Sequence, residues 1–128
     1  MAEALLKQAF PNRNVHSAGL GALIGHPADP ISIQLMHDAG IDITSHIARQ
    51  ISSVHVAQAD IILVMDHDQR RFIEARFPAA RGKVFRLGED DKVDIPDPYK
   101  EGIDSFQHSL KLVRNGVFSW TEKIKKMG

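Results

Sequence analysis

The segment ADIILVM at 59–65, with its uninterrupted IILVM, constrains the fold more than any other feature of the sequence. A strand with one face in water alternates apolar and polar residues, whereas a strand covered on both faces reads as a continuous apolar run. Such runs are typical of parallel sheets, which carry helices on both faces. The segment therefore predicts an α/β fold.

The rest of the chain alternates helical and extended patterns around this strand. In chain order, the other expected elements are a helix at 1–10 stopped by Pro11, a strand at 15–19, a helix opened by Asp29 and Pro30 and closed by Gly40, irregular helical turns at 44–58, a helix after Asp66 or Asp68 that ends before Pro78, a strand at 83–87, and a final helix. Alternation of this kind implies a parallel sheet covered by helices.

The final helix carries an apolar stripe whose members recur at steps of three and four residues, which predicts core packing. The stripe consists of Phe106, Leu110, Val113, Val117, Trp120, Ile124 and Met127. Gly116 lies inside the helix, where glycine costs about 1 kcal/mol relative to alanine.

The length and composition favour one soluble domain over residues 1–128. Lys plus Arg and Asp plus Glu are both 16, so no strong basic field predicts a nucleic-acid or anionic-membrane partner. A signal-peptide pattern and a membrane-length apolar run are both missing, and we expect a cytoplasmic protein. The sequence contains no cysteine, which excludes disulfides, zinc–thiolate sites and a cysteine nucleophile supplied by these residues.

Asp97 is the first candidate for chemistry, because Pro96 and Pro98 stiffen the loop that carries it. A carboxylic acid on a stiff loop beside an aromatic residue can protonate a leaving group. The alternative is an Asx-type turn with no catalytic role, and on spacing alone that alternative is favoured.

The remaining polar motifs give weaker signals. The glycine-rich loop at 19–25 matches neither common nucleotide-binding pattern, and it either cradles a ligand or only provides backbone freedom. The Asp66-His67-Asp68 triplet does not have metal-ligand spacing, and no cofactor is implied. We interpret His46 as a hydrogen-bonded structural residue and EDDK at 89–92 as a solvated loop.

Six segments, taken together, resemble the low-molecular-weight protein tyrosine phosphatases, especially bacterial members that act alongside tyrosine autokinases in capsule and exopolysaccharide export. The segments are MAEALL, SAGLGALIGHPADP, HIARQI, ADIILVMD, RGKVFRLGE and DIPDPY. They occur in the family's order and span essentially all of the chain.

The resemblance implies a three-layer α/β sandwich with a short parallel sheet of strand order 2-1-3-4. It also implies that Asp97 is the general acid, that Tyr99 forms one wall of the substrate cleft and that Leu23 forms the other. His46 falls in a stretch that is structural in the family. The implied partner is a phosphotyrosine protein, such as a bacterial tyrosine autokinase, and no cofactor is needed. Arsenate reduction on the same fold needs several cysteines, so their absence counts against it.

The sequence departs from the family at its start. The family begins with a central strand and a C-x5-R phosphate loop before the helix that begins here at Met1. We therefore expect a domain without its first strand, its nucleophile or its phosphate loop, and inactive alone. Either the chain is shortened at its N-terminus, which we favour, or it is a truncated remnant that binds partners without catalysis. Exposed strand edges would favour a homo-oligomer.

Overall fold

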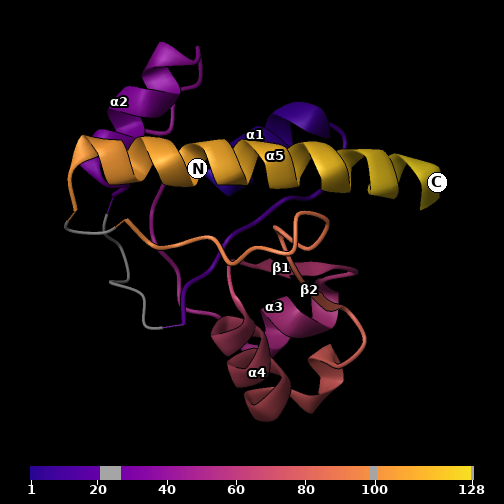
Figure 1. The fold of residues 1–128 in the computed structure, drawn as a ribbon. Coiled ribbons are helices and arrows are strands. Elements are labelled where there is room, and N and C mark those ends of the chain that lie inside the picture. The colour runs from indigo at the N-terminus through magenta and orange to yellow at the C-terminus, as the bar shows by residue number, and fades with distance from the viewer. Residues whose placement is uncertain (21–26, 99–100, 128) are drawn as a thin grey trace.

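A short parallel sheet lies between two groups of helices in the computed structural model, which describes residues 1–20, 27–98 and 101–127 (Figure 1). The first helical layer consists of α1 (Ala2–Ala9), α2 (Pro30–Asp38) and α5 (Ile103–Met127). The second consists of α3 (Ser53–Gln58), α4 (His67–Arg76) and the 3₁₀ turn η1 (Pro78–Ala80). The predicted α/β class and its three layers are confirmed.

The sheet consists of β1 (Ile62–Val64) and β2 (Val84–Arg86), paired in parallel with Ile62 opposite Val84. Within the described ranges these two strands form the only sheet, so of the family's four-strand order just this neighbouring pair is observed. Pairing of exposed strand edges between copies stays a prediction.

Successive residues of the strands face different cores, as the continuous apolar run at 59–65 predicted. Val64 and Val84 pack with Val56 and Ile73 beneath the sheet, in a cluster with α3 and α4. Leu63 and Phe85, one residue along, pack on the opposite face against α5. The apolar run at 59–65 is thus divided between two cores, which explains why it does not alternate with polar residues.

The strand predicted at 15–19 is wrong for most of its length. Gly19 alone forms a parallel bridge, with Gln50: its N–H donates to the carbonyl of Arg49 at 2.7 Å, and its carbonyl accepts from Ile51 at 2.9 Å. A strand exists only where a neighbour completes its hydrogen-bond ladder, and residues 15–18 have no such ladder among the described residues.

The predicted helix signals are confirmed at α2 and α4. The carboxylates of Asp29 and Asp66 each accept a backbone N–H two or three residues on, at 2.8 Å. Gly40 follows α2 with φ of 79°, a left-handed conformation that glycine adopts without strain. In the irregular stretch 44–58, only α3 is an α-helix, opened by Ser52.

The apolar stripe of α5 is buried from Phe106 to Trp120, as predicted. The ring of Trp120 lies 5.3 Å from that of Phe85, so the helix packs directly on the sheet. Met127 is wrong as a core residue, because its side chain is 69% exposed. The C-terminal end of α5 extends beyond the two strands (Figure 1).

Gly116 is a point of close approach between α5 and the end of β2. A β-carbon there would lie 2.6 Å from the carbonyl oxygen of Leu87 and 2.7 Å from its Cγ atom. Both distances are shorter than real carbon contacts, and one partner is backbone at the end of β2. The glycine is therefore required by packing, although it weakens the helix.

Gly116→Ala should destabilise the domain, because a shift of α5 or β2 at a cost of about 1–3 kcal/mol exceeds the gain of about 1 kcal/mol in helix propensity. Urea unfolding measures the difference. The exposed neighbour variant Asn115→Ala reports propensity without crowding and should be neutral or slightly stabilising. A more stable Gly116→Ala protein would contradict this packing.

Candidate active site

Asp97 lies on the segment that leaves β2 and runs between the sheet and α5 toward the start of that helix (Figure 1). Its side chain is exposed. The other two predicted site residues, Tyr99 and Leu23, lie outside the described residues.

Two hydrogen bonds hold the backbone immediately before Asp97. The N–H of Ile95, a residue only 2% exposed, donates to the carbonyl of Met65 at 2.8 Å. The buried hydroxyl of Ser109 on α5 donates to the carbonyl of Pro96 at 2.9 Å. Because Met65 directly follows β1, the acid-bearing loop passes the carboxyl end of the sheet, which is the edge where α/β proteins bind ligands.

A buried arginine provides a third attachment. Arg86, the last residue of β2, is 7% exposed, and its guanidinium donates to Asp94 through Nη1 and to Glu89 through Nε, both at 2.9 Å. Hydrogen bonds to Asp94 and Glu89 raise the pKa of Arg86, and the bond from Arg86 is the main reason why the pKa of Asp94 is lowered. The guanidinium therefore joins both ends of the turn that precedes Asp97.

The turn at 89–92 is more than the solvated loop that was predicted. Glu89 pairs with Arg86, and Asp90 pairs with Lys123 on α5. The Lys123 ammonium lies 4.7 Å from the centroid of the Trp120 ring, and the indole N–H donates to the carbonyl of Arg86 at 3.0 Å. The turn is consequently attached both to β2 and to α5.

A second polar cluster surrounds the first turn of α1. Glu3 accepts a hydrogen bond from the Ser17 hydroxyl, pairs with Lys7 at 3.0 Å, and lies 4.0 Å from Nδ1 of His46. Burial opposes ionisation of Glu3, but the hydrogen bonds from Ser17 and Lys7 outweigh it and lower its pKa. The contact with Glu3 fits the structural interpretation of His46. That His46 has a structural rather than a catalytic role stays a prediction.

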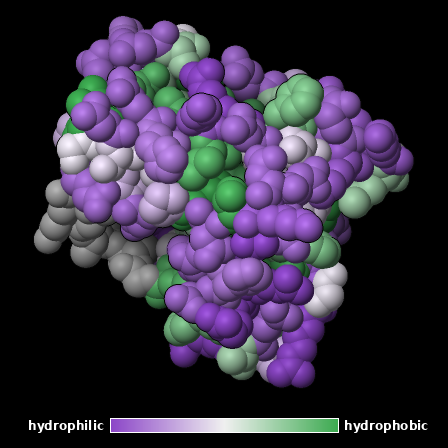
Figure 2. All heavy atoms as spheres, viewed as in Figure 1, coloured by the Kyte–Doolittle hydropathy of each residue, from purple (hydrophilic) through white to green (hydrophobic). Residues whose placement is uncertain are grey.

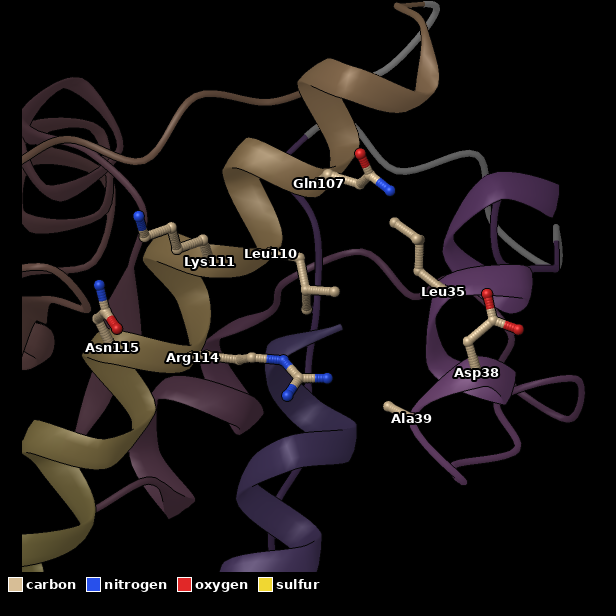
Figure 3. Close-up of a pocket in the computed structure, with 8 residues that line it drawn as sticks. All are labelled: Leu35, Asp38, Ala39, Gln107, Leu110, Lys111, Arg114 and Asn115. Carbon is tan, nitrogen blue, oxygen red and sulfur yellow. The ribbon is translucent and has the colours of Figure 1, made fainter.

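A groove of about 440 Å³ separates α2 from α5, where Gln107, Leu110 and Arg114 extend toward Leu35 and Asp38 (Figure 3). Asp97 is not among the residues that line it. On the face seen in Figure 2, hydrophilic residues predominate and hydrophobic ones form small clusters between them. The acid-bearing loop and this groove are thus separate features.

Within the described ranges, no group of three His, Asp or Glu residues could hold a metal ion. Over the same residues, α5 and the shorter helices are all too short or too polar to span a membrane.

Sequence reasoning missed Arg86, Asp94 and Ser109. A signal for the first was present, since an arginine inside the strand KVFRL must either reach solvent or find buried partners. Two carboxylates nearby in the chain, Glu89 and Asp94, were the available partners. Nothing in the pattern around Ser109 distinguishes it from other small residues of an amphipathic helix.

The fold and this loop together define an α/β domain that presents a carboxylic acid at the carboxyl edge of a parallel sheet. The family model for low molecular weight phosphotyrosine protein phosphatases matches residues 1–128. The chain belongs to that family.

Relatives of known sequence and solved structures of similar fold agree with this family assignment. The probable low molecular weight protein-tyrosine-phosphatase EpsP of Ralstonia nicotianae is 46% identical over 128 residues, covering all of this chain and 88% of that protein. Vibrio vulnificus Wzb, solved with benzylphosphonate, superposes with a TM-score of 0.91 at 34% identity, over 95% of this chain and 87% of that one. The YwlE arginine phosphatase of Geobacillus stearothermophilus superposes equally well, with a TM-score of 0.91 at 27% identity, over 98% of this chain and 84% of its own.

The ion pair between Arg86 and Asp94 should make stability depend on pH in one direction. Because the folded-state pKa of Asp94 lies below its ordinary 3.8, the pair stabilises the fold above pH 3.8 and loses its effect as the pH falls through the folded-state value. The difference in unfolding free energy between wild type and Asp94→Asn should therefore shrink below pH 3.8.

Urea unfolding over a pH series measures this difference. Asp94 is half exposed, so added salt should also reduce it. Asp91→Asn, on the same turn, serves as the control for loss of a surface carboxylate. A difference for Asp94→Asn that grows as the solution is acidified would contradict the pairing.

Proposed function

We propose that the domain serves the hydrolysis of phosphotyrosine monoesters in protein substrates, with Asp97 as the general acid. Asp97 would donate its proton to the tyrosyl oxygen as the phosphorus–oxygen bond breaks, and would later take a proton from the water that attacks phosphorus. The observation that carries this proposal is the position of an exposed carboxylate on a loop that is attached to β1, β2 and α5 at the carboxyl edge of the sheet.

Chemical requirements explain why attachment matters. A general acid must lie within hydrogen-bond reach of the leaving oxygen, and its contribution is typically about 10²–10⁴ in rate. A mobile loop would lose much of this rate contribution, because a misplacement of the acid by about 1 Å can lower the rate about 10²-fold. The names of EpsP and Wzb relatives, both protein-tyrosine-phosphatases, support the same reaction.

The family's reaction also needs a thiolate that forms a phosphocysteine, and none of the 128 residues can supply it. We therefore propose that these residues alone do not turn over phosphotyrosine, and that they contribute the acid together with the cleft walls Tyr99 and Leu23. The natural partner would be a phosphotyrosine protein, for which a bacterial tyrosine autokinase is the candidate.

A second function is binding to a phosphotyrosine protein without catalysis, and the lack of a thiolate is the observation that favours it. Isothermal calorimetry with a phosphotyrosine peptide and its unphosphorylated counterpart tests this function. Phosphate-dependent binding to the 128-residue chain would favour it, and equal or undetectable binding of the two peptides would remove it.

The catalytic proposal predicts how the rate depends on the leaving group. We would compare the 128-residue chain with the product of its gene that includes any in-frame codons preceding Met1. The 128-residue chain should be inactive, and a product that supplies a thiolate should be active. In that product, Asp97→Asn should lower kcat/KM, which reports the step in which the aryl oxygen leaves, about 10²–10⁴-fold with phenyl phosphate, a poor leaving group. The loss should be far smaller with 2,4-dinitrophenyl phosphate, whose leaving oxygen needs no proton.

The matched control is Asp91→Asn, which removes an exposed carboxylate from the turn before the loop and should leave both rates unchanged. Equal losses of kcat/KM with both esters would show that Asp97 is not the acid. Because YwlE is an arginine phosphatase, phosphoarginine belongs in the same assay. A preference for it over phosphotyrosine would contradict the substrate class proposed here.

A further inference from the structure

We propose that Arg86 and Ser109 are positioning residues that aim Asp97, and this inference rests on the proposed role of Asp97 as the general acid. Their hydrogen bonds hold residues that precede the acid. Arg86 on β2 holds Asp94, and Ser109 on α5 holds Pro96.

Arg86 fixes where the loop begins. A guanidinium with several donors on a planar fork holds its partners in a defined direction, unlike a single ammonium. Here Nε holds Glu89 and Nη1 holds Asp94, so the turn between them is closed across one rigid group. The loop thus starts from a point determined by β2.

Ser109 fixes the loop one residue before the acid. Its side chain is 2% exposed, and its hydroxyl donates to the carbonyl of Pro96. The carbonyl of Pro96 and the N–H of Asp97 belong to one planar peptide unit, so a hydrogen bond to the carbonyl orients both groups. The peptide plane that includes the nitrogen of Asp97 is therefore oriented by α5.

The bond from Ile95 to Met65 lies between these two attachments and provides a way to measure them. Exchange of a buried amide hydrogen requires local opening, so the exchange rate of the Ile95 amide reports how firmly the loop is held. This measurement needs no catalytic activity, and it can be made on the 128-residue chain by NMR.

Three variants remove the attachments one at a time: Arg86→Met, Asp94→Asn and Ser109→Ala. Each should speed exchange at Ile95 by roughly five- to tenfold, the effect of losing about one net hydrogen bond. The amide of Phe77, bonded to Ile73 at the far end of α4, should not change. Asp94→Asn changes the half-exposed partner of the ion pair and leaves the buried Arg86 in place. It therefore tests the contact even where Arg86→Met fails to fold.

The controls remove a carboxylate and a hydroxyl that are not among the attachments described here. Asp91→Asn removes an exposed carboxylate from the turn, and Ser119→Ala removes a hydroxyl from α5 ten residues beyond Ser109. Both should leave exchange at Ile95 close to wild type. Arg86→Lys keeps the charge and should recover part of the protection.

The catalytic readout uses a product that supplies a thiolate. Loss of a positioning residue should lower kcat/KM for phenyl phosphate about 10²-fold and leave that for 2,4-dinitrophenyl phosphate nearly unaffected, since only the first leaving group needs an aimed acid. A purely structural role would lower both rates together.

Two results separate this inference from the proposed function. If Asp97→Asn shows the leaving-group effect and the three variants do not, or if exchange at Ile95 is unchanged in all three, the positioning roles are wrong and the acid stands. If Asp97→Asn itself shows no such effect, the proposed function fails and the positioning roles fail with it, even where the exchange data show a firmly held loop.

Discussion

In the part of the chain that the structure describes, the sheet consists of two strands of three residues each, and both of its faces must be covered for the fold to exist. A sheet this short has little hydrogen bonding of its own, so its stability comes from the helices packed on it. α5 covers one face, and it approaches so closely that Gly116 lies against the carbonyl of Leu87. The distance between α5 and β2 sets the geometry of everything that follows β2.

The candidate site depends directly on that contact. The chain leaves β2 at Arg86, and the next residue, Leu87, lies against Gly116 of α5. The loop then reaches Pro96, whose carbonyl accepts the hydrogen bond from Ser109 on the same helix. The indole of Trp120 ties the Arg86 carbonyl to the same helix. Helix, strand and loop are therefore one packed unit, and the position of Asp97 follows from how α5 sits on the sheet rather than from contacts of the acid alone.

Much of this architecture could be predicted because its causes are local. The continuous apolar run at 59–65 predicted a doubly covered strand, and Asp29 and Asp66 predicted helix starts, since a cap needs only the residues beside it. The strand at 15–19 failed because a strand also needs a partner, which no local pattern reveals. The same reason hid the contact of Ser109 with Pro96, which joins a helix and a loop thirteen residues apart in the chain.

Arg86 shows how stability and function make different demands on one position. β2 is otherwise apolar, and replacing a buried ion pair by well-packed apolar residues is often neutral or stabilising for a fold. A methionine or leucine at this position would fill the strand at no cost in hydrophobic packing, but it would leave Asp94 and Glu89 with nothing to hold them. Packing of the core therefore does not explain why an arginine stands at position 86, whereas its hydrogen bonds to the loop do. Residues of this kind, polar where the local pattern asks for an apolar side chain, are the places where a sequence departs from what its fold alone requires.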